Sequence, residues 1–269
     1  MDNLLCATNR KYIYKSIQVI ISLSAAIIII ELMRISGWSI GISFCYLPRL
    51  ADILKKCDVI FKTQDYYWNI LISIIRVYSG FAIAFLIALP MAVLITECRW
   101  FNYIFFPLVE IVRPIPNAAW VPLSILLFKS IDGSVLFITF VGAFFPILIN
   151  SIEGLSNVNP NYIKIAKSFK LKPISYICEV KIPAAGPNIY TGVLLGMSGS
   201  WLGVVVAEMM NGESGIGYMT WVNYTLVDIS GVIICMFTIG LLGALSGVFL
   251  RTVNNYIHWS GYENNEEMY

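Results

Sequence analysis

Residue types that carry out chemistry in enzymes are scarce in this sequence. It contains one histidine, His258, so neither a serine–histidine nor a cysteine–histidine arrangement is expected. Its six cysteines include no CxxC pair, and too few ligands lie near one another to predict a metal site. We expect no enzyme activity, no cofactor and no bound metal. The cysteines are Cys6, Cys45, Cys57, Cys98, Cys178 and Cys235.

A glycine-rich stretch, residues 211–217, lies beside two carboxylates, Glu208 and Glu213. Paired carboxylates can act as general acid and base, but we expect these two to be solvated charges at a helix end. The stretch is not followed by the lysine of a phosphate-binding loop, and the chain contains no GxxxxGK[ST] motif. We predict a turn in an outer loop, with phosphate binding as the alternative.

Two arginines, Arg76 and Arg113, lie close to or inside long apolar runs, where an unpaired charge is costly. We expect Arg76 near the outer end of one membrane span and Arg113 near the cytoplasmic start of the next. Each could contact a transported solute. Each could instead snorkel or form a structural ion pair, for which Glu110 stands three residues before Arg113. We favour the structural roles.

Three prolines interrupt the apolar segment that follows Arg113: Pro114, Pro116 and Pro122. Irregular backbone inside a membrane is tolerated only where protein or a water-filled cavity surrounds it. Residues 113–122 are therefore predicted to line a pathway or gate, with a packed kink as the alternative. Trp120 in this segment and Trp201 further on are either interfacial anchors or pore-facing side chains.

The composition indicates what must position these residues. Only 13% of the 269 residues are charged and 58% are hydrophobic, and the mean hydropathy is +0.76. Such a chain cannot cover a soluble surface with polar groups, so its apolar excess must face lipid. The net charge is +2, with no basic stripe interleaved with aromatics, which argues against nucleic-acid binding.

Six stretches are long and apolar enough to span a bilayer as helices. The sequence thus predicts an all-α, polytopic membrane protein with one domain over residues 1–269. The first stretch follows Arg10, Lys11 and Lys15 and lacks a cleavage site, so we expect it to be retained. The spans are about 16–35, 69–96, 114–128 (starting as early as Phe105), 133–152, 187–207 and 229–250.

The distribution of lysine and arginine orients these spans. Five lysines lie between the fourth and fifth spans, whereas no lysine or arginine lies between the fifth and sixth. By the positive-inside rule both termini are cytoplasmic. This places Cys98 and Cys178 inside and Cys57 outside, although four basic residues between 37 and 67 then also lie outside. The five lysines are Lys164, Lys167, Lys170, Lys172 and Lys181.

The loop of about 153–187 carries two short amphipathic patterns. Asn159 and Pro160 form a helix start, with a capping side chain and then proline at the first position. A second short helix is expected from Pro173 until Pro183 ends it. The two helices either lie on lipid headgroups or dock into a partner. Periodicity alone favours the headgroups. The predicted apolar face is Tyr162, Ile163, Ala166 and Phe169, with Ala166 as its tightest position.

This loop resembles the cytoplasmic coupling loop of permeases in binding-protein-dependent ATP-binding cassette (ABC) importers, written E-A-A, three residues, G, and later I-x-L-P. Ala166 matches the second alanine, and Ile182 and Pro183 match its end. Lys164 replaces the glutamate, Ile165 the first alanine and Lys170 the glycine. Because lysine stands where the motif has glycine, we expect an ordinary helical or bridging conformation at residue 170.

Further motifs extend the resemblance over residues 46–259. The stretch from Glu110 to Pro122 resembles E-x-x-R-P-x-P…A-W-x-P-L, and the stretch from Thr191 to Glu208 resembles T-G…W…A-E. Both are most similar to the branch that imports nitrate, taurine, alkanesulfonates and bicarbonate, and that includes permeases for thiamine precursors. Ser73 and Arg76 resemble an S-L-x-R element.

The resemblance implies a type I ABC importer permease in the inner membrane. It implies two cytoplasmic ATP-binding subunits, a second permease copy, most simply as a homodimer, and an extracytoplasmic substrate-binding protein. The alternative is a secondary transporter or channel that works alone. The coupling residues would be Pro160, Tyr162, Ile163, Lys164, Ala166, Lys167, Phe169, Lys170 and Leu171. The candidate pathway residues are Arg76, Arg113, Pro116, Trp120, Trp201 and Glu208.

Overall fold

The computed structural model describes residues 47–256, and all regular secondary structure in this range is helical. This confirms the all-α prediction. The elements are α2 (Leu50–Ile60), α3 (Gln64–Glu97), α4 (Arg99–Val112), α5 (Asn117–Leu127), α6 (Ile131–Ser156), α7 (Pro160–Ser168), α8 (Pro173–Ser175), the π-helical segment η2 (Tyr176–Lys181), α9 (Ile182–Asn211), α10 (Ile216–Thr225) and α11 (Ile229–Tyr256).

The chain divides into two compact units, residues 1–58 and 59–269. Most of α2 belongs to the first unit, where it is an 11-residue helix with an acidic residue, Asp52, in its first turn. A carboxylate there interacts favourably with the positive end of the helix dipole. The remaining helices belong to the second unit, and the single domain expected over 1–269 stays a prediction.

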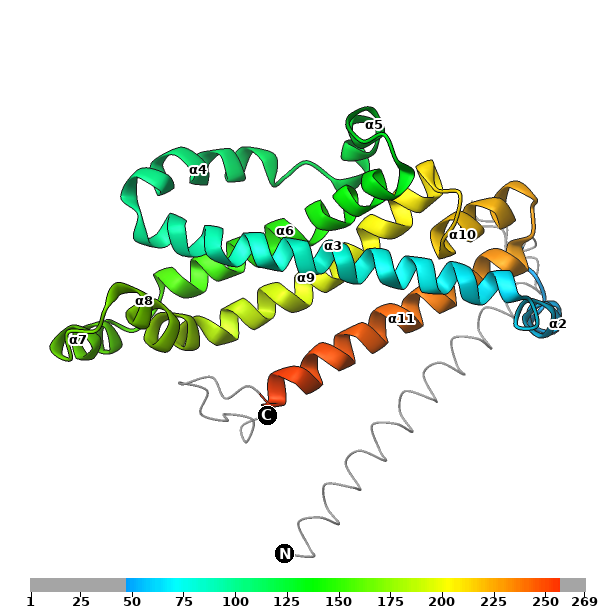
Figure 1. Ribbon diagram of the computed structural model, residues 1–269. Helices are drawn as coiled ribbons and strands as arrows, with labels where there is room; N and C mark the ends of the chain where they lie inside the picture. Colours follow the sequence, from blue (N-terminus) through cyan, green and yellow to red (C-terminus); the bar gives the residue numbers. More distant parts are fainter. Residues whose placement is uncertain (1–46, 257–269) are drawn as a thin grey trace, which may run out of the picture. The chain divides into compact units, whose positions relative to one another are not determined.

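The core of the second unit is a close pair of helices, α6 and α9, with α3 packed along α6 (Figure 1). Gly142 on α6 lies against Gly199 on α9, so closely that a Cβ on either would meet the other's carbonyl oxygen. Gly80 on α3 fits against Thr139 on α6 in the same way. Small residues at such contacts let helix backbones approach in a membrane. The three helices therefore form one packed body.

Four helices among the described residues are long and apolar enough to cross a membrane: α3, α6, the continuous helix Pro173–Asn211 and α11. They confirm the spans predicted at 69–96, 133–152, 187–207 and 229–250, and each helix is longer than predicted. The span predicted at 16–35 lies outside the described residues. The total of six spans therefore stays a prediction.

The span predicted at 114–128 is wrong as a single straight helix. The apolar segment begins as α4 at Arg99, turns at residues 113–116, and continues as α5 at an angle of 106°. Pro114 and Pro116 have no N–H and cannot donate the hydrogen bonds that would continue the helix, although Arg113 before Pro114 still has helical dihedrals. The pair is a broken span or a re-entrant loop. The earlier start suggested near Phe105 falls inside α4.

The second short helix of the 153–187 loop begins at Pro173 as predicted, but the prediction that it ends at Pro183 is also wrong. Residues 173–211 form one continuous helix, in which α8 runs through η2 into α9. Pro183 follows the π-helical segment directly: the Ile182 N–H donates five residues back to the Ile177 carbonyl oxygen, so the missing N–H of Pro183 falls where the hydrogen-bond register changes. The wider turns of η2 bring the backbone to this proline without a break.

The helices of the second unit have two distinct ends (Figure 1). At one end, named the α7 end, α3 finishes at Glu97 and lies near η2, from which α7 projects. At the opposite end, named the α10 end, α3 begins, α9 finishes and α10 packs against both. The sequence did not predict α10, which lies between the last two spans.

Candidate functional site

α7 begins as its sequence predicts. Pro160 is its first residue, and the side-chain oxygen of Asn159 accepts a hydrogen bond of 2.9 Å from the backbone N–H of Asn161. This satisfies one of the free N–H groups in the first turn of the helix. The capping prediction is therefore confirmed.

The end of α7 contradicts the expectation for Lys170. Its φ is +49°, so it lies in the left-handed region that glycine adopts readily and that L-residues, asparagine and aspartate apart, rarely adopt. The N–H of Leu171 donates to the carbonyl oxygen of Ala166 at 3.4 Å, five residues back. This bond and the left-handed residue before it define a Schellman motif, which terminates the helix. Ending the helix in this way requires a left-handed conformation at residue 170. Lysine therefore adopts it at the position where the family motif has glycine.

Part of the predicted apolar face of α7 is buried by this chain, and part of it is exposed. Ala166 is buried by the chain itself, with 4% of its surface exposed, and Ile163 packs against the core. Tyr162 and Phe169 remain exposed, Phe169 at 76%. Ile165, which the apolar face did not include, is 54% exposed. The uncovered apolar stripe is thus Tyr162, Ile165 and Phe169, at helical spacing i, i+3, i+7.

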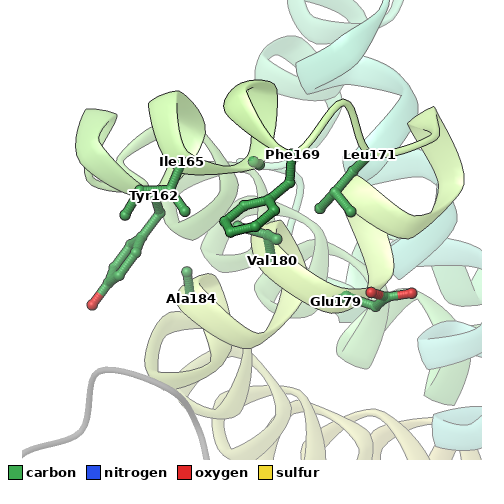
Figure 2. Close-up of a pocket in the computed structure, with 8 residues that line it drawn as sticks. Tyr162, Ile165, Phe169, Leu171, Glu179, Val180 and Ala184 are labelled. Atoms are coloured by element: carbon green, nitrogen blue, oxygen red, sulfur yellow. The ribbon is translucent and has the colours of Figure 1, made fainter.

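A groove of about 400 Å³ lies between α7 and the helix that follows it (Figure 2). The ring of Phe169 extends over Val180, and Tyr162 directs its hydroxyl outward (Figure 2). Only one lining residue, Glu179, is charged. We name this the α7 groove. It is lined by Tyr162, Ile165, Ala166, Phe169, Leu171, Glu179, Val180 and Ala184.

An ion pair fixes the wall of the α7 groove to the core. Lys181, at the end of η2, donates to the carboxylate of Glu97, the last residue of α3. Lys181 is 7% exposed, so it is not a solvated loop lysine. Three other lysines, on α7 and in the turn after it, are exposed: Lys164, Lys170 and Lys172. The side chain of Lys167 is outside the described set.

At the α10 end, a buried ion pair joins α3 to α9. Nη1 of Arg76 donates to Glu208 Oε1 at 2.9 Å and to the carbonyl oxygen of Ser214 at 2.8 Å. The same guanidinium donates to Asp132, at the start of α6, from Nε at 3.0 Å and Nη2 at 2.5 Å. Arg76 is 7% exposed, whereas the Asp132 side chain is 80% exposed.

Glu208 corrects the expectation of a solvated carboxylate. None of its surface is exposed, whereas Glu213 is exposed as predicted. Ser73 Oγ donates to its two oxygens at 2.9 and 2.8 Å, and the Gly217 N–H donates at 3.0 Å. Gly215 has φ +111°, and a Cβ there would overlap the carboxylate. The glycine-rich stretch is therefore a turn, as predicted. In the first turn of α10, the Gly217 N–H donates to the Glu208 carboxylate and the Ile216 N–H donates to Ser73 Oγ.

The candidate pathway residues Arg113 and Pro116 lie in the turn between α4 and α5. Arg113 was expected near the start of its span, and this is wrong. The apolar segment begins at Arg99, and Arg113 follows the 14 residues of α4. The predicted pair with Glu110 is absent: within residues 47–256 Arg113 forms no ion pair, and both side chains are exposed.

The two tryptophans differ from each other. Trp201 is 5% exposed, and its indole N–H donates to Ser246 Oγ on α11 at 3.1 Å, so it is a core residue. Trp120 is partly buried against Phe137, and its buried Nε1 has no hydrogen-bond partner among the described residues. Within this chain, Trp201 is therefore neither an interfacial anchor nor a pore-facing side chain.

Sequence reasoning missed two participants, Asn69 and Asp132, and the spacing of residues could have indicated only Asn69. Asn69, Ser73 and Arg76 form a polar stripe on one face of the otherwise apolar α3. Asn69 accepts a hydrogen bond of 2.6 Å from the Gly215 N–H, so the whole stripe contacts the α10 turn. Asp132 had no such signal, because its partner Arg76 is 56 residues away.

Comparison with known proteins gives a consistent result. The family model described as "Binding-protein-dependent transport system inner membrane component" matches residues 80–258. A putative ABC transporter permease of Methanocaldococcus jannaschii is 38% identical over 79% of this chain and 82% of its own length. The bicarbonate transport system permease CmpB of Synechococcus elongatus is 32% identical, over 71% of this chain and 69% of its own.

Two further matches extend the comparison. The nitrate import permease NrtB of Synechocystis is 31% identical over 70% of this chain and 69% of its own length. A chain of the inward-facing MetNI methionine ABC transporter superposes with a TM-score of 0.57, covering 72% of this chain and 96% of that one. At 18% identity, this structural match supports the fold alone.

Proposed function

The chain belongs to the family of binding-protein-dependent transport system inner membrane components, and we propose that it moves a small anion as the permease of an ABC importer. As a member it is a multi-pass membrane protein and a non-catalytic subunit of the transporter. Membership implies an ATPase and a substrate-binding protein as partners. The proposal adds the site where the ATPase docks, the cargo class and the topology.

The α7 groove carries the proposal for the docking site. An exposed apolar stripe beside an apolar groove is the surface that a partner protein would cover. An ATPase segment would place apolar side chains against Phe169 and Val180, while its acidic groups meet Lys170 and Lys172, the two neighbours in sequence of the groove residue Leu171. Two such subunits would serve a permease dimer, which we propose to be a homodimer.

The cargo class rests on two relatives and one arginine. The names of those relatives specify bicarbonate and nitrate, both planar oxygen anions. Arg113 is exposed at the α4–α5 break and unpaired within residues 47–256, so its guanidinium is available to such an anion. Its permanent positive charge would attract such an anion, so the charge matters here more than the shape of the side chain. A sulfonate, taurine or a thiamine precursor are the other cargoes that the test must compare.

Uptake into proteoliposomes that contain the permease, its ATPase and its binding protein tests the cargo. Labelled bicarbonate and nitrate should enter only with ATP. Arg113→Lys should keep much of this uptake because it keeps the charge, and Arg113→Gln should lower it by roughly ten- to a hundredfold, as for a lost hydrogen bond to a charged group. Equal loss in both variants would contradict an anion contact and indicate a structural role.

The proposed topology has six spans, with the α7 end and both termini in the cytoplasm. Cys98 and Cys178 are exposed at the α7 end, and Cys57 precedes α3. An impermeant thiol reagent on intact cells should therefore label Cys57 and spare the other two. With permeabilised cells, all three should react. Labelling of Cys178 before permeabilisation would reverse the proposed orientation.

A transporter or channel that works alone is the second candidate, and the buried Arg76–Glu208 pair favours it. Ionisable residues inside membrane helices often belong to ion-coupling sites. This pair, however, is fully occupied by Ser73, Asp132 and the α10 turn. Uptake by the permease without any ATPase, driven by an ion gradient, would support this candidate over the importer.

A further inference from the structure

Two ion pairs connect the same two helices at opposite ends. At the α7 end, Glu97 of α3 pairs with Lys181, the residue before α9. At the α10 end, Arg76 of α3 pairs with Glu208 of α9. The two helices are antiparallel. At the α7 end α3 carries the acidic residue and the other helix the basic one, and at the α10 end α3 carries the basic residue and α9 the acidic one. Each pair thus joins opposite charges across the same helix pair.

The helices between these pairs are continuous. α3 runs unbroken from Gln64 to Glu97, and about 30 Å of it separates Arg76 from Glu97 at 1.5 Å per residue. Residues 173–211 are likewise one helix, which carries both Glu179 and Val180 of the α7 groove and, further along, Glu208. The α7 groove wall and the carboxylate beneath α10 are therefore parts of one rod.

The packing between the helices leaves little room for sliding. Gly80 of α3 and Gly199 of α9 both fit directly against α6, with contacts that no added Cβ would permit. Interlocked small residues of this kind resist displacement along the helix axis, because any shift brings larger side chains into contact. Ion pairs at the two ends add resistance to separation.

We propose that the Glu97–Lys181 pair fixes the wall of the α7 groove to α3, so that α3 and α9 move together, as one rigid strut, when the groove moves. This rests on the proposed function, in which the ATPase docks at the α7 groove. Glu97 and Lys181 are then positioning residues for ATP-driven transport. They touch neither ATPase nor cargo, but they fix the groove wall to the strut.

Charge exchange between the two residues separates this role from simple support of the fold. The complete importer, with ATPase and binding protein, is reconstituted with Glu97→Gln, Lys181→Met or the exchanged pair Glu97→Lys with Lys181→Glu. The single variants should keep ATPase co-purification but lose about tenfold of the ATPase stimulation by cargo-loaded binding protein. The exchanged pair should recover it. Glu153→Gln and Arg99→Gln, both exposed charges at the same end, are matched controls that should behave as the parent.

Three outcomes overturn the strut. Single variants with unchanged stimulation would show that the pair does not transmit movement. Loss of ATPase co-purification in single and exchanged variants alike would reduce the pair to support of the groove. A parent importer that binds no ATPase would instead overturn the proposed function, so the two failures are distinguishable.

A distance measurement tests rigidity without relying on activity. Spin labels on Cys98, directly after α3, and on Cys178 in η2 report the separation of the two helices at the α7 end, with the other cysteines replaced by serine. Their separation should be the same in the ATP-free and ATP-trapped importer. A change of more than about 5 Å, one helical turn, would contradict a rigid strut.

Discussion

The two ends of the second unit solve opposite problems. At the α10 end, charged groups that should face water are covered: Arg76 and Glu208 are buried and fully hydrogen-bonded. At the α7 end, apolar groups are left uncovered by this chain: Ile165 is 54% exposed and Phe169 is 76% exposed. A buried charge with all its partners present needs nothing further. An exposed apolar groove is incomplete without a partner. The buried charges of the α10 end are thus satisfied within the chain, and the α7 groove is not.

The largest expected effect tests the satisfied end. Arg76→Leu leaves Glu208 charged, buried and without its cation, which should lower the free energy of unfolding by about 3–5 kcal/mol. Thermal unfolding of the purified permease in detergent measures this loss. The double variant Arg76→Leu with Glu208→Leu should recover part of it, because no lone charge remains.

Glu213→Gln is the matched control for that measurement. It removes an exposed carboxylate from the same turn, so its effect should stay within about 0.5 kcal/mol. An Arg76→Leu variant as stable as this control would show that the α10 end is not held together by its buried charges, and the contrast between the ends would disappear.

How far the sequence predicts each region follows from the range of its interactions. Helices α3, α6, α9 and α11 were predicted because about twenty consecutive apolar residues are a local signal. The capping of α7 by Asn159 is equally local. Glu208 was misplaced because its partners Ser73 and Arg76 lie more than 130 residues away. No local pattern shows that a carboxylate will find a cation.

Errors at the α7 end have a different origin. Pro183 was expected to end a helix. The helix instead continues through it, because the π-helical segment η2 directly before it changes the hydrogen-bond register, and local sequence rules do not predict that geometry. Ala166 was expected to meet a partner, but η2 and the start of α9 lie against that face, and the chain covers it itself. A periodic apolar face shows which residues are covered, not by which chain.

An intermediate effect tests the unsatisfied end. Phe169→Asp and Ile165→Asp each place a charge on the exposed apolar stripe, and each should weaken ATPase binding by about 2 kcal/mol, or thirtyfold. Stability should not change, because both side chains are largely exposed in this chain. Co-purification of the ATPase measures binding, and thermal unfolding measures stability.

Two further substitutions sharpen this test. Lys164→Ala, on an exposed position outside the groove lining, should bind the ATPase nearly as the parent does. Ala166→Asp should lose both stability and ATPase binding, because the chain itself buries Ala166. Normal ATPase binding by Phe169→Asp and Ile165→Asp would favour the alternative in which α7 lies on lipid headgroups.

The smallest effect concerns the end of α7, where lysine adopts a conformation suited to glycine. Lys170 has φ +49°, and a left-handed conformation costs an L-residue about 1–2 kcal/mol that glycine does not lose. Lys170→Gly removes this strain and keeps the Leu171-to-Ala166 hydrogen bond. Its greater backbone entropy in the unfolded chain offsets part of the gain. The net result should be up to about 1 kcal/mol of added stability in α7, seen as slower hydrogen exchange of its amides.

Lys170→Val should do the reverse, because a β-branched residue fits this region worst. Faster exchange in Lys170→Gly than in the parent would mean that the lysine side chain stabilises the turn, and the Schellman geometry would not explain how α7 ends.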